Sequence, residues 1–307
     1  MKRLIKAVLN EFLWRISSIR SNPVERSRMY KLRKEILSLP VITIDPASSA
    51  ATKAWLANRI ELRGQISWRD PRNFLQWDVV QRTMFHKCKQ IELEFLKKLP
   101  NWEDSARYLV EDSIGNPKKF SFMPESSGNL IHHLYGISRF LGTHPVSVQN
   151  MSQVVEFGGG YGSIARLFYK MGFNGRYVIF DVPEFAALQE FFLSSLDISI
   201  PIFRYPTRER GIVILTEIED FKKQCAFEQI DLFIATWSIS ESPLELREIV
   251  LKSVDGAKYW LFAYQKRFQD IDNIEYFRKY MSSSQYDSNG FEIEHLPGQY
   301  YAFGSKK

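Results

Sequence analysis

The spacing of apolar residues changes about halfway along the chain. Through residue 145, apolar positions recur at helical spacing between proline-containing turns at Asn22-Pro23, Leu39-Pro40, Asp70-Pro71 and Leu99-Pro100. This pattern predicts a mainly helical region over residues 1–145. Its longest helix is expected within residues 74–98. Another is expected over residues 128–142, where one apolar stripe contains Leu130, Leu134, Ile137 and Leu141.

From residue 146 onward, short apolar runs alternate with helical segments. Buried strands are predicted at Ser152–Phe157, Arg176–Asp181, Gly211–Thr216, Ile230–Trp237 and Lys258–Tyr264. Helices are expected over Ser163–Met171 and residues 270–281, and from Pro183 onward. Another follows the capping-box pattern Ser242-Pro243-Leu244-Glu245. Strands that alternate with helices imply right-handed crossovers and a parallel sheet.

The end of the chain predicts an antiparallel addition to this sheet. Phe291–Leu296 and Gln299–Phe303 flank Pro297-Gly298, a pattern typical of a hairpin. Five parallel strands followed by a hairpin form the architecture of class I methyltransferases. We therefore expect an α/β fold with a Rossmann-like, mostly parallel sheet of this class over residues 146–307. The helical region 1–145 precedes it.

A glycine-rich segment connects the first predicted strand to the next helix, and it reads Glu156-Phe157-Gly158-Gly159-Gly160-Tyr161-Gly162. Its glycines allow a sharp turn and close approach of the backbone to a ligand. The helix that starts at Ser163 offers free N–H groups to an anionic group. Glu156 would repel a pyrophosphate, but it can accept a hydrogen bond from the cationic amino group of a methionine moiety. Asp181 ends the next strand, 19 residues after Gly162, where it can accept ribose hydroxyls.

These features favour S-adenosylmethionine as the cofactor, with S-adenosylhomocysteine as its product. A nicotinamide dinucleotide is the alternative, because Gly160–Ala165 also fits G-x-G-x-x-A. A catalytically silent relative is a third interpretation. Glu156, the terminal hairpin and the absence of a second α/β half favour the methyl donor. The predicted cofactor contacts are Glu156, Phe157, Gly158, Gly159, Gly160, Tyr161, Gly162, Asp181, Val182, Thr236 and Trp237.

The fourth predicted strand ends in Thr236-Trp237-Ser238-Ile239-Ser240-Glu241. Methyltransferases that act on the amines of adenine or glutamine carry Asn/Asp-Pro-Pro-Tyr at this place. Because that motif is missing, an oxygen or carbon acceptor is favoured. Packing against the sheet is the alternative role of Trp237, and a solvated position in the first turn of a helix is the alternative for Glu241.

The stretch from 126 to 307 resembles the bacterial sugar O-methyltransferases, class I enzymes often associated with cell-surface polysaccharide synthesis. The matching segments are Asn129–His133, Glu156–Leu167, Ile179–Glu184, Thr236–Glu241 and His295–Gly298. Residues 1–70 match little. The resemblance implies a methyl donor and a carbohydrate or sugar-nucleotide acceptor, whereas the spacing arguments above reach only the donor.

Methyl transfer to a hydroxyl needs a route for the proton, and the candidate bases are His132, His133, Glu241 and His295. His133 lies on the apolar stripe of its helix, where a buried structural histidine is the alternative. His132 is expected on the opposite face, toward a polar cleft. His295 is expected where the sixth strand turns into the hairpin. No Asp-Asp or His/Asp cluster has metal-ligand spacing, so no metal is predicted.

The N-terminal helices are expected to supply the acceptor pocket. Aromatic side chains there could stack on the apolar faces of a sugar, although most aromatics at such spacing belong to a core. The candidates are Trp55, Phe74, Phe85, Trp68 and Trp77.

Composition and cysteine content indicate a globular protein of the reducing cytoplasm. The chain is 45% hydrophobic and 25% charged, and it has no run of about 18 apolar residues. Lys2 and Arg3 begin it like a signal peptide, but charged residues soon interrupt the apolar run, so secretion is not expected. Cys88 and Cys225 fit no metal or redox spacing.

Positive charge is concentrated at the N-terminus. Residues 1–36 hold ten Lys/Arg and three Glu, a net +7, whereas the remainder holds 31 basic and 32 acidic residues, a net −1. An apolar stripe in this basic arm contains Leu4, Val8, Phe12 and Ile16. The arm either packs on the body as a helix or contacts an acidic partner or the inner face of the membrane. A body of net −1 argues against a groove that follows nucleic-acid phosphates, so no nucleic-acid partner is expected.

Overall fold

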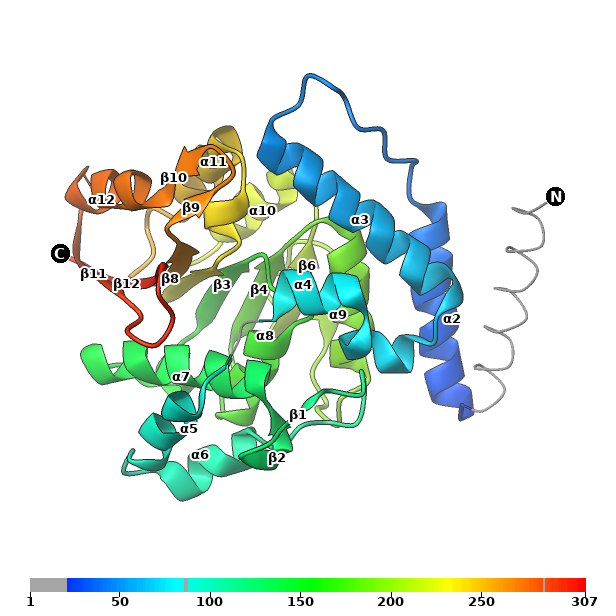
Figure 1. Ribbon diagram of the computed structural model, residues 1–307, viewed down its shortest axis with the longest axis horizontal. Coiled ribbons are helices and arrows are strands. Elements are labelled where there is room, and N and C mark those ends of the chain that lie inside the picture. Colours follow the sequence, from blue (N-terminus) through cyan, green and yellow to red (C-terminus); the bar gives the residue numbers. More distant parts are fainter. Residues whose placement is uncertain (1–20, 86–87, 284) are drawn as a thin grey trace.

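The computed structural model describes residues 21–85, 88–283 and 285–307, and at its centre lies an eight-stranded sheet (Figure 1). The strand order is β11-β12-β8-β7-β3-β4-β6-β5. The strands are β3 (Gln153–Phe157), β4 (Arg176–Phe180), β5 (Ile202–Phe203), β6 (Gly211–Leu215), β7 (Leu232–Thr236), β8 (Tyr259–Gln265), β11 (Tyr286–Glu292) and β12 (Gln299–Lys306). Strands β3 to β8 pair in parallel, and β12 lies antiparallel between β8 and β11.

This topology confirms the predicted Rossmann-like fold of class I methyltransferases. The chain order reverses between β3 and β7, the neighbouring strands at which two series of crossovers diverge. Ligands of open α/β sheets bind at such a switch point, beyond the carboxyl ends of the strands. The fold therefore directs attention to the residues that follow β3, β4 and β7. Short β5, at one edge of the sheet, was not predicted.

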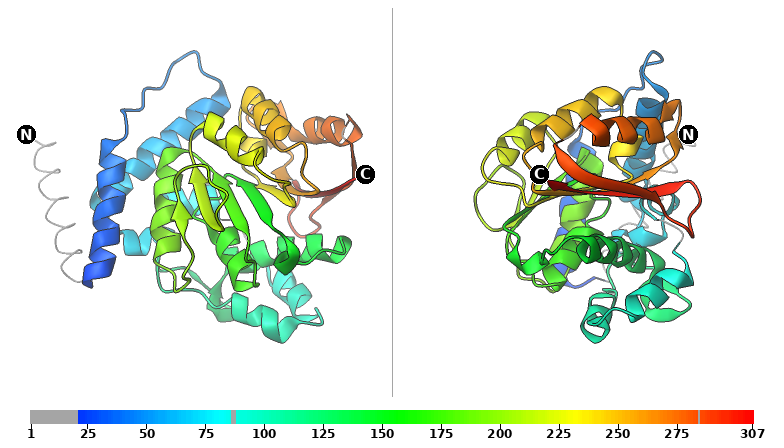
Figure 2. Two further views of the ribbon diagram at one scale, coloured as in Figure 1. Left: turned by 180° about the vertical axis from the view of Figure 1, so that it is seen from behind. Right: turned by 90° about the vertical axis from the view of Figure 1, so that its left-hand side faces the viewer.

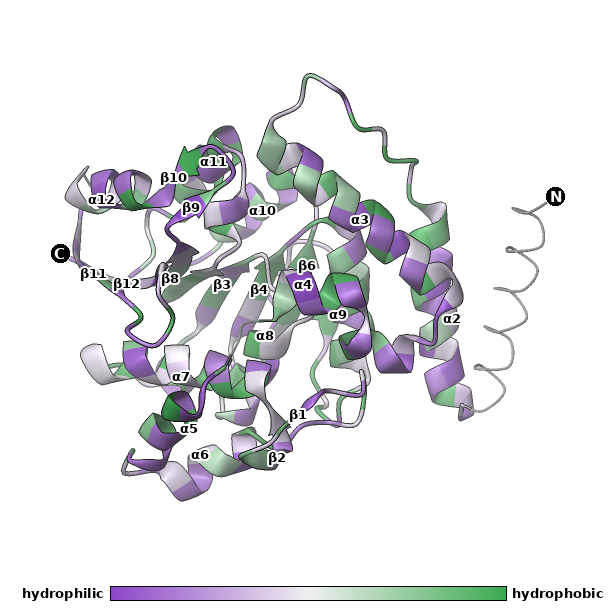
Figure 3. Cartoon of the chain, in the orientation of Figure 1, coloured by the Kyte–Doolittle hydropathy of each residue, from purple (hydrophilic) through white to green (hydrophobic). Residues whose placement is uncertain are grey.

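Helices cover both faces of the sheet, as Figure 2 shows in its right-hand view. One face carries α7 (Gly128–Thr143), α8 (Ser163–Lys170) and α9 (Pro183–Ser194), and the other carries α10 (Ile218–Cys225), α11 (Leu244–Ser253) and α12 (Asn273–Ser283). All five residues of β3, β4 and β6 are buried, because their alternating side chains enter one core or the other. The central strands accordingly appear hydrophobic in Figure 3.

The N-terminal helices extend the core on the α7–α9 face. Helix α2 (Pro23–Ser38) packs on α9, and α3 (Ala50–Trp68) packs on both of them. The remaining elements of this region are η1 (Pro71–Gln76), α4 (Asp78–Met84), α5 (Gln90–Lys97), α6 (Trp102–Tyr108), β1 (Lys119–Phe120) and β2 (Met123–Ser127). Their buried residues belong to the same hydrophobic cluster as one face of the sheet. The helical region and the sheet thus share a core.

Two local predictions were wrong. The expected long helix over 74–98 is divided among η1, α4 and α5, because Phe85 takes an extended conformation and ends α4. The capping box at Ser242–Glu245 does not form either: α11 begins at Leu244 after Pro243, without a side-chain cap. Helix α7 matches its prediction closely. A hairpin of β11 and β12 closes the sheet as expected, but its first strand is Tyr286–Glu292 and not Phe291–Leu296, because residues 293–298 form the connecting loop.

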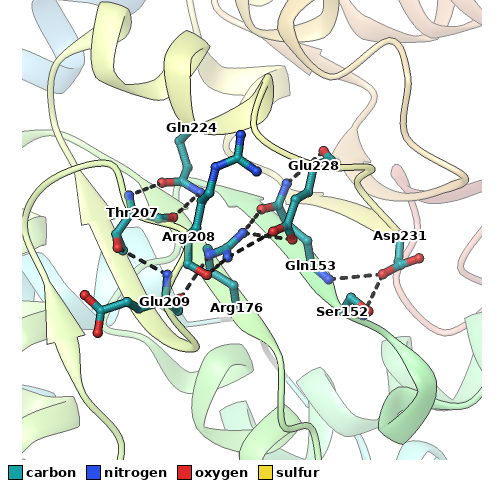
Figure 4. Close-up of polar contacts among 9 residues, drawn as sticks. All are labelled: Ser152, Gln153, Arg176, Thr207, Arg208, Glu209, Gln224, Glu228 and Asp231. Atoms are coloured by element: carbon teal, nitrogen blue, oxygen red, sulfur yellow. Dashed lines mark hydrogen bonds and ion pairs between the residues drawn. The ribbon is translucent and has the colours of Figure 1, made fainter.

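A polar network fixes the amino ends of β3 and β4, opposite the ends that carry the glycine loop (Figure 4). Buried Arg176 donates to Gln153 Oε1 at 2.9 Å, to Glu228 Oε2 at 3.1 Å and to backbone carbonyls. Asp231 accepts hydrogen bonds from the backbone N–H groups of Ser152 and Gln153. These contacts satisfy polar groups that the buried sheet would otherwise leave unpaired.

The remaining short elements are η2 (Val148–Asn150), η3 (Ile239–Glu241), β9 (Arg267–Phe268) and β10 (Ile271–Asp272). None of the helices in the described part of the chain is long and apolar enough to cross a membrane. The predicted apolar stripe of the basic arm, at Leu4, Val8, Phe12 and Ile16, lies outside the described residues. Of that arm, the structure describes α2, which starts at a capping box between Asn22 and Glu25.

Candidate functional site

The glycine loop after β3 has the conformation that its sequence requires. Gly158, Gly160 and Gly162 have φ angles of +71°, +57° and +95°. A Cβ at Gly158 would lie 2.3 Å from Ser238 Cβ, so a side chain there would clash. At Gly160 a Cβ would be in ordinary contact with Met84, at 3.7 Å, so the positive φ and not crowding favours glycine there. The loop can therefore lie close to a ligand, and Gly162 begins α8.

Glu156 is a buried carboxylate at the end of β3. Its side chain accepts a hydrogen bond from the Tyr177 hydroxyl at 2.9 Å. Burial and, to a smaller extent, the nearby charge of Asp181 raise the pKa of Glu156 to about 8, against the lowering effect of the Tyr177 hydrogen bond. Within the described residues, no lysine, arginine or histidine forms an ion pair with Glu156. The site therefore matches a ligand that brings its own positive charge.

Asp181 follows β4 and faces the same region. Its carboxylate accepts hydrogen bonds from the Val182 N–H at 2.8 Å and from Gln189 Nε2 at 2.7 Å. Burial raises its pKa to about 7. Gln189 Nε2 also donates to the Gly160 carbonyl at 3.0 Å, so one side chain joins the glycine loop to Asp181. Sequence reasoning missed Gln189, although its position on the inward, apolar face of α9 was a usable signal.

These groups open onto one cavity beyond the carboxyl ends of the strands. It is lined by Trp55, Arg82, Thr83, Met84, Phe85, His133, Glu156, Gly158, Gly159, Gly160, Tyr161, Ser163, Ile164, Asp181, Phe185, Thr236, Trp237, Ser238 and Glu241. A neighbouring hollow of about 390 Å³ shares Trp55, Gly158, Asp181 and Ser238 with it. Phe157 and Val182 line this second hollow. Of the eleven predicted cofactor contacts, all except Gly162 line one of the two spaces.

Helix α3 forms the wall on the N-terminal side. Trp55 packs edge-on against Phe185, with ring centroids 5.8 Å apart. Arg59 and Arg63 both pair with Glu184, which is fully buried in the first turn of α9. Among the aromatic residues proposed for the acceptor pocket, Trp55 and Phe85 line the cavity. Phe74 and Trp77 are core residues instead, and Trp68 lines neither space.

Trp237 has an unusual backbone conformation directly after β7. Its φ of +61° is uncommon for a residue with a side chain and costs about 1–3 kcal/mol. Its backbone N–H donates to the Ala263 carbonyl, and its indole N–H donates to Gln299 Oε1 at 2.6 Å. These bonds hold the buried indole against the cavity. Trp237 therefore packs on the sheet and also lines the cavity.

The structure reverses the predicted roles of the two neighbouring histidines. His133 lines the cavity, and its Nδ1 lies 3.0 Å from Ser163 Oγ. Burial lowers its pKa to about 3, and the adjacent His132 contributes to this shift. His132 is buried, with its Nδ1 3.0 Å from both carboxylate oxygens of Glu92. The apolar stripe misled the prediction because α7 is covered by α5 as well as by α8.

His295 belongs to the same buried cluster, since its Nε2 lies 2.6 Å from Glu92 Oε1. It lies in the loop between β11 and β12 rather than on a strand. Burial opposes the charged form of Glu92, but hydrogen bonds with His132 and His295 and the charge of His132 lower its pKa. Neither His132 nor His295 lines the cavity of the glycine loop.

Glu241 lines the cavity from the loop after β7. Burial raises its pKa to about 7, and a hydrogen bond from Gln265 Nε2 to Oε1 at 3.3 Å partly offsets this effect. Its side chain is therefore not the solvated acid of the alternative interpretation. Of the four candidate bases, the fold brings His133 and Glu241 to the cavity. Across the described ranges, no group of three or more His, Cys, Asp or Glu residues is arranged to hold a metal ion.

The chain was compared with known proteins by sequence and by structure. No family model and no curated protein matches the chain. The magnesium protoporphyrin IX methyltransferase ChlM from Synechocystis PCC 6803, with bound SAM, is similar at a TM-score of 0.40 and 9% identity. That match covers 73% of this chain and 100% of ChlM. The precorrin-6y C5,15-methyltransferase from Geobacter metallireducens GS-15 is similar at 0.41 and 9% identity, over 62% and 94% of the two chains. The 16S rRNA methylase ArmA is similar at 0.37 and 10% identity, over 70% and 91%.

Proposed function

We propose that this protein is an S-adenosylmethionine-dependent O-methyltransferase that acts on a sugar hydroxyl in surface polysaccharide or its precursor. One observation supports the donor above all others. A buried carboxylate without a cationic partner among the described residues, Glu156, lies between a glycine loop of positive φ and Asp181, all on one cavity. A sulfonium nucleoside carries an amino acid end and a ribose that match these groups.

The residues present fit this cofactor at each of its parts. Glu156 would accept a hydrogen bond from the ammonium group, and the free N–H groups at the start of α8 suit its carboxylate. Asp181 would accept hydrogen bonds from the ribose hydroxyls. The second hollow, between Val182 and Leu246, would take the adenine. When bound, the cofactor supplies an electrophilic methyl group on sulfur. A dinucleotide fits less well, because it has no ammonium group to pair with Glu156.

Glu241 is the stronger candidate for the base that removes the acceptor's proton. A general base works best when its pKa lies near the operating pH. The pKa of Glu241 is about 7, whereas that of His133 is about 3. Glu241 would take the hydroxyl proton as the oxygen forms its bond to the methyl carbon and the carbon–sulfur bond breaks. His133 stays neutral and can hydrogen-bond the acceptor.

The sugar acceptor is proposed from the sequence resemblance together with the lining of the cavity. Trp55, Phe85 and Trp237 present aromatic surface, and Arg82 and Glu241 add polar groups that can bind hydroxyls. Such a mixture suits a sugar ring, which has apolar faces and a polar edge. A nucleic acid is the alternative acceptor.

Donor and acceptor can be tested separately. Thermal unfolding with S-adenosylhomocysteine or NADH tests the donor: at about 100 times Kd, a bound ligand stabilises the protein by about 2.7 kcal/mol. Stabilisation by NADH alone would reverse the assignment. Labelled S-adenosylmethionine offered with sugar nucleotides, isolated surface polysaccharide or RNA tests the acceptor. Label in RNA alone would replace the sugar proposal.

A further inference from the structure

Arg247 on α11 is a fully buried arginine whose hydrogen-bond partners are all neutral. It donates to the Ser240 carbonyl at 2.5 Å, to the Ser242 carbonyl at 2.9 Å and to Asn273 Oδ1 at 2.9 Å. Its guanidinium lies 4.7 Å from the centre of the Tyr276 ring. Over the described ranges, no carboxylate forms an ion pair with it. Burying a charge without a counter-ion is costly, so this arrangement calls for an explanation.

The two carbonyls that Arg247 binds flank Glu241 in the sequence. Arg247 therefore fixes the backbone on both sides of the one carboxylate in this loop that lines the cavity. Trp55 Nε1 binds the Glu241 carbonyl at 3.2 Å from the opposite side. With three consecutive carbonyls bound, the loop has little freedom to turn Glu241 away from the cavity.

Gln265, at the end of β8, extends this restraint to the side chain. Ser240 Oγ shares its one hydroxyl hydrogen between Gln265 Oε1 at 2.8 Å and the Trp237 carbonyl at 2.6 Å, and the contact with Oε1 orients the amide. Gln265 Nε2 then faces Glu241 Oε1 at 3.3 Å. Asn273 Nδ2 binds the Gln265 carbonyl at 3.0 Å, while Asn273 Oδ1 binds Arg247. Arg247, Asn273 and Gln265 thus form a continuous chain of hydrogen bonds around Glu241.

We infer that Gln265 and Arg247 are positioning residues that hold the Glu241 carboxylate toward the acceptor and set the pH at which it ionises. This inference rests on the proposed function, in which Glu241 accepts the acceptor's proton. Gln265 acts on the carboxylate directly through an N–H donor that favours the charged form. Arg247 acts through the backbone. Neither residue lines the cavity, so neither touches the acceptor.

Other charged groups share the cavity with Glu241. They are Arg82 from α4, His133 from α7, Glu156 from β3 and Asp181 after β4. Arg82 pairs with Glu61 at 2.7 Å, and both side chains are exposed. Glu156 and Asp181 also have raised pKa values, of about 8 and about 7. A test must therefore separate the titration of Glu241 from theirs.

Infrared difference spectroscopy of the full chain provides that separation. The carboxyl C=O band is followed as pH is raised, and the part that disappears in Glu241→Gln belongs to Glu241. Gln265→Leu removes the donor, so the midpoint of this band should shift to higher pH. Arg247→Lys keeps the charge but loses the forked contacts, so Glu241 should become more hydrated and its midpoint should fall toward the ordinary carboxyl range.

Arg176→Lys is the matched control. Arg176 is also buried and also binds several carbonyls, but at the opposite end of the sheet (Figure 4). Arg176→Lys should lower stability without moving the pH midpoint of the Glu241 band. An unchanged midpoint in Gln265→Leu and Arg247→Lys, or an equal shift in Arg176→Lys, would overturn the inference. If Arg247→Lys fails to fold, Gln265→Leu alone decides.

Turnover then separates this inference from the proposed function. With an acceptor found in the labelled-donor screen, Gln265→Leu should lower kcat by up to about 10²-fold, with KM and S-adenosylhomocysteine affinity nearly unchanged. Its pH–rate profile should shift upward with the infrared midpoint. Normal kcat and an unshifted profile would refute the positioning role while leaving the methyltransferase proposal intact. Absence of donor binding and of any labelled product in the unmodified protein would refute the proposed function itself.

Discussion

Gln189 Nε2 lies 2.7 Å from Asp181 Oδ2 and binds the Gly160 carbonyl with the same nitrogen. The carboxylate proposed for the ribose is thereby held against the loop proposed for the methionine end. We predict that Asp181→Ala weakens S-adenosylhomocysteine binding by about 1.5–3 kcal/mol, because hydrogen bonds to a charged acceptor are lost. Isothermal titration measures this loss, and circular dichroism should show an intact fold. Unchanged affinity would mean that Asp181 does not hold the ribose.

Stability should depend on pH through Glu156. Its pKa is about 8 in the folded chain against an ordinary value of 4.5, so the folded state binds the proton more tightly than the unfolded state. Stability from this group is therefore fully present below about pH 4.5 and is lost as pH rises through about 8. Urea unfolding across this pH range should show the loss of stability, and Glu156→Gln should make the stability less dependent on pH. An equal slope in both proteins would assign the effect to other groups.

Substitutions of His132 and His133 should have different effects, because the two side chains lie in different places. His132→Leu removes a hydrogen bond from buried Glu92, so we expect a loss of about 1–3 kcal/mol in stability with little change in donor affinity. His133 lies in the cavity, so His133→Gln should change the KM for the acceptor more than it changes stability. Urea unfolding and steady-state kinetics of both variants test this contrast. The reverse pattern would show that the cluster at Glu92 serves the reaction.

Glu241→Gln should lower kcat by about 10²–10⁴-fold if Glu241 is the general base. In the unmodified protein the rate should rise with pH through about 7, because the carboxylate must be ionised to accept a proton. Donor affinity should hardly change, since Glu156 and Asp181 are untouched. A variant with near-normal kcat would remove Glu241 from the chemistry.

Deleting residues 1–20 tests the basic arm. We expect the truncated chain to keep its donor affinity and to associate less with anionic vesicles, because these residues carry much of the excess positive charge. Vesicle sedimentation at low and high salt measures the difference. Loss of folding on truncation would instead assign the apolar stripe to the core.

The sheet could be predicted because its central strands are easy to recognise in the sequence. β3, β4 and β6 are buried on both faces, so each contains consecutive apolar residues, such as Val154-Val155, Val178-Ile179 and Ile212–Leu215. Glu156, the glycines and Asp181 were found for a related reason. Their positions relative to strand ends are local, and parallel strands bring such ends together automatically.

Several of the residues that the sequence did not indicate act through contacts between distant parts of the chain. Gln265 meets Glu241 from 24 positions away, and Glu92 meets His295 across 203 positions. The side of α7 that is buried depends on where α5 packs, which no periodicity within α7 records. Arg247 resembled an ordinary helical arginine, because only the fold shows that it points inward at backbone carbonyls.

Trp55 lines both the cavity and the neighbouring hollow, and its indole N–H donates to the Glu241 carbonyl. A nucleoside on one side and an acceptor on the other would therefore press on the same indole. Any coupling between two such ligands has the same magnitude in both directions. If an acceptor that shifts Trp55 changes the affinity for S-adenosylhomocysteine by some factor, S-adenosylhomocysteine changes the affinity for that acceptor by the same factor. A substitution at Trp55 would therefore alter any such coupling for both ligands at once.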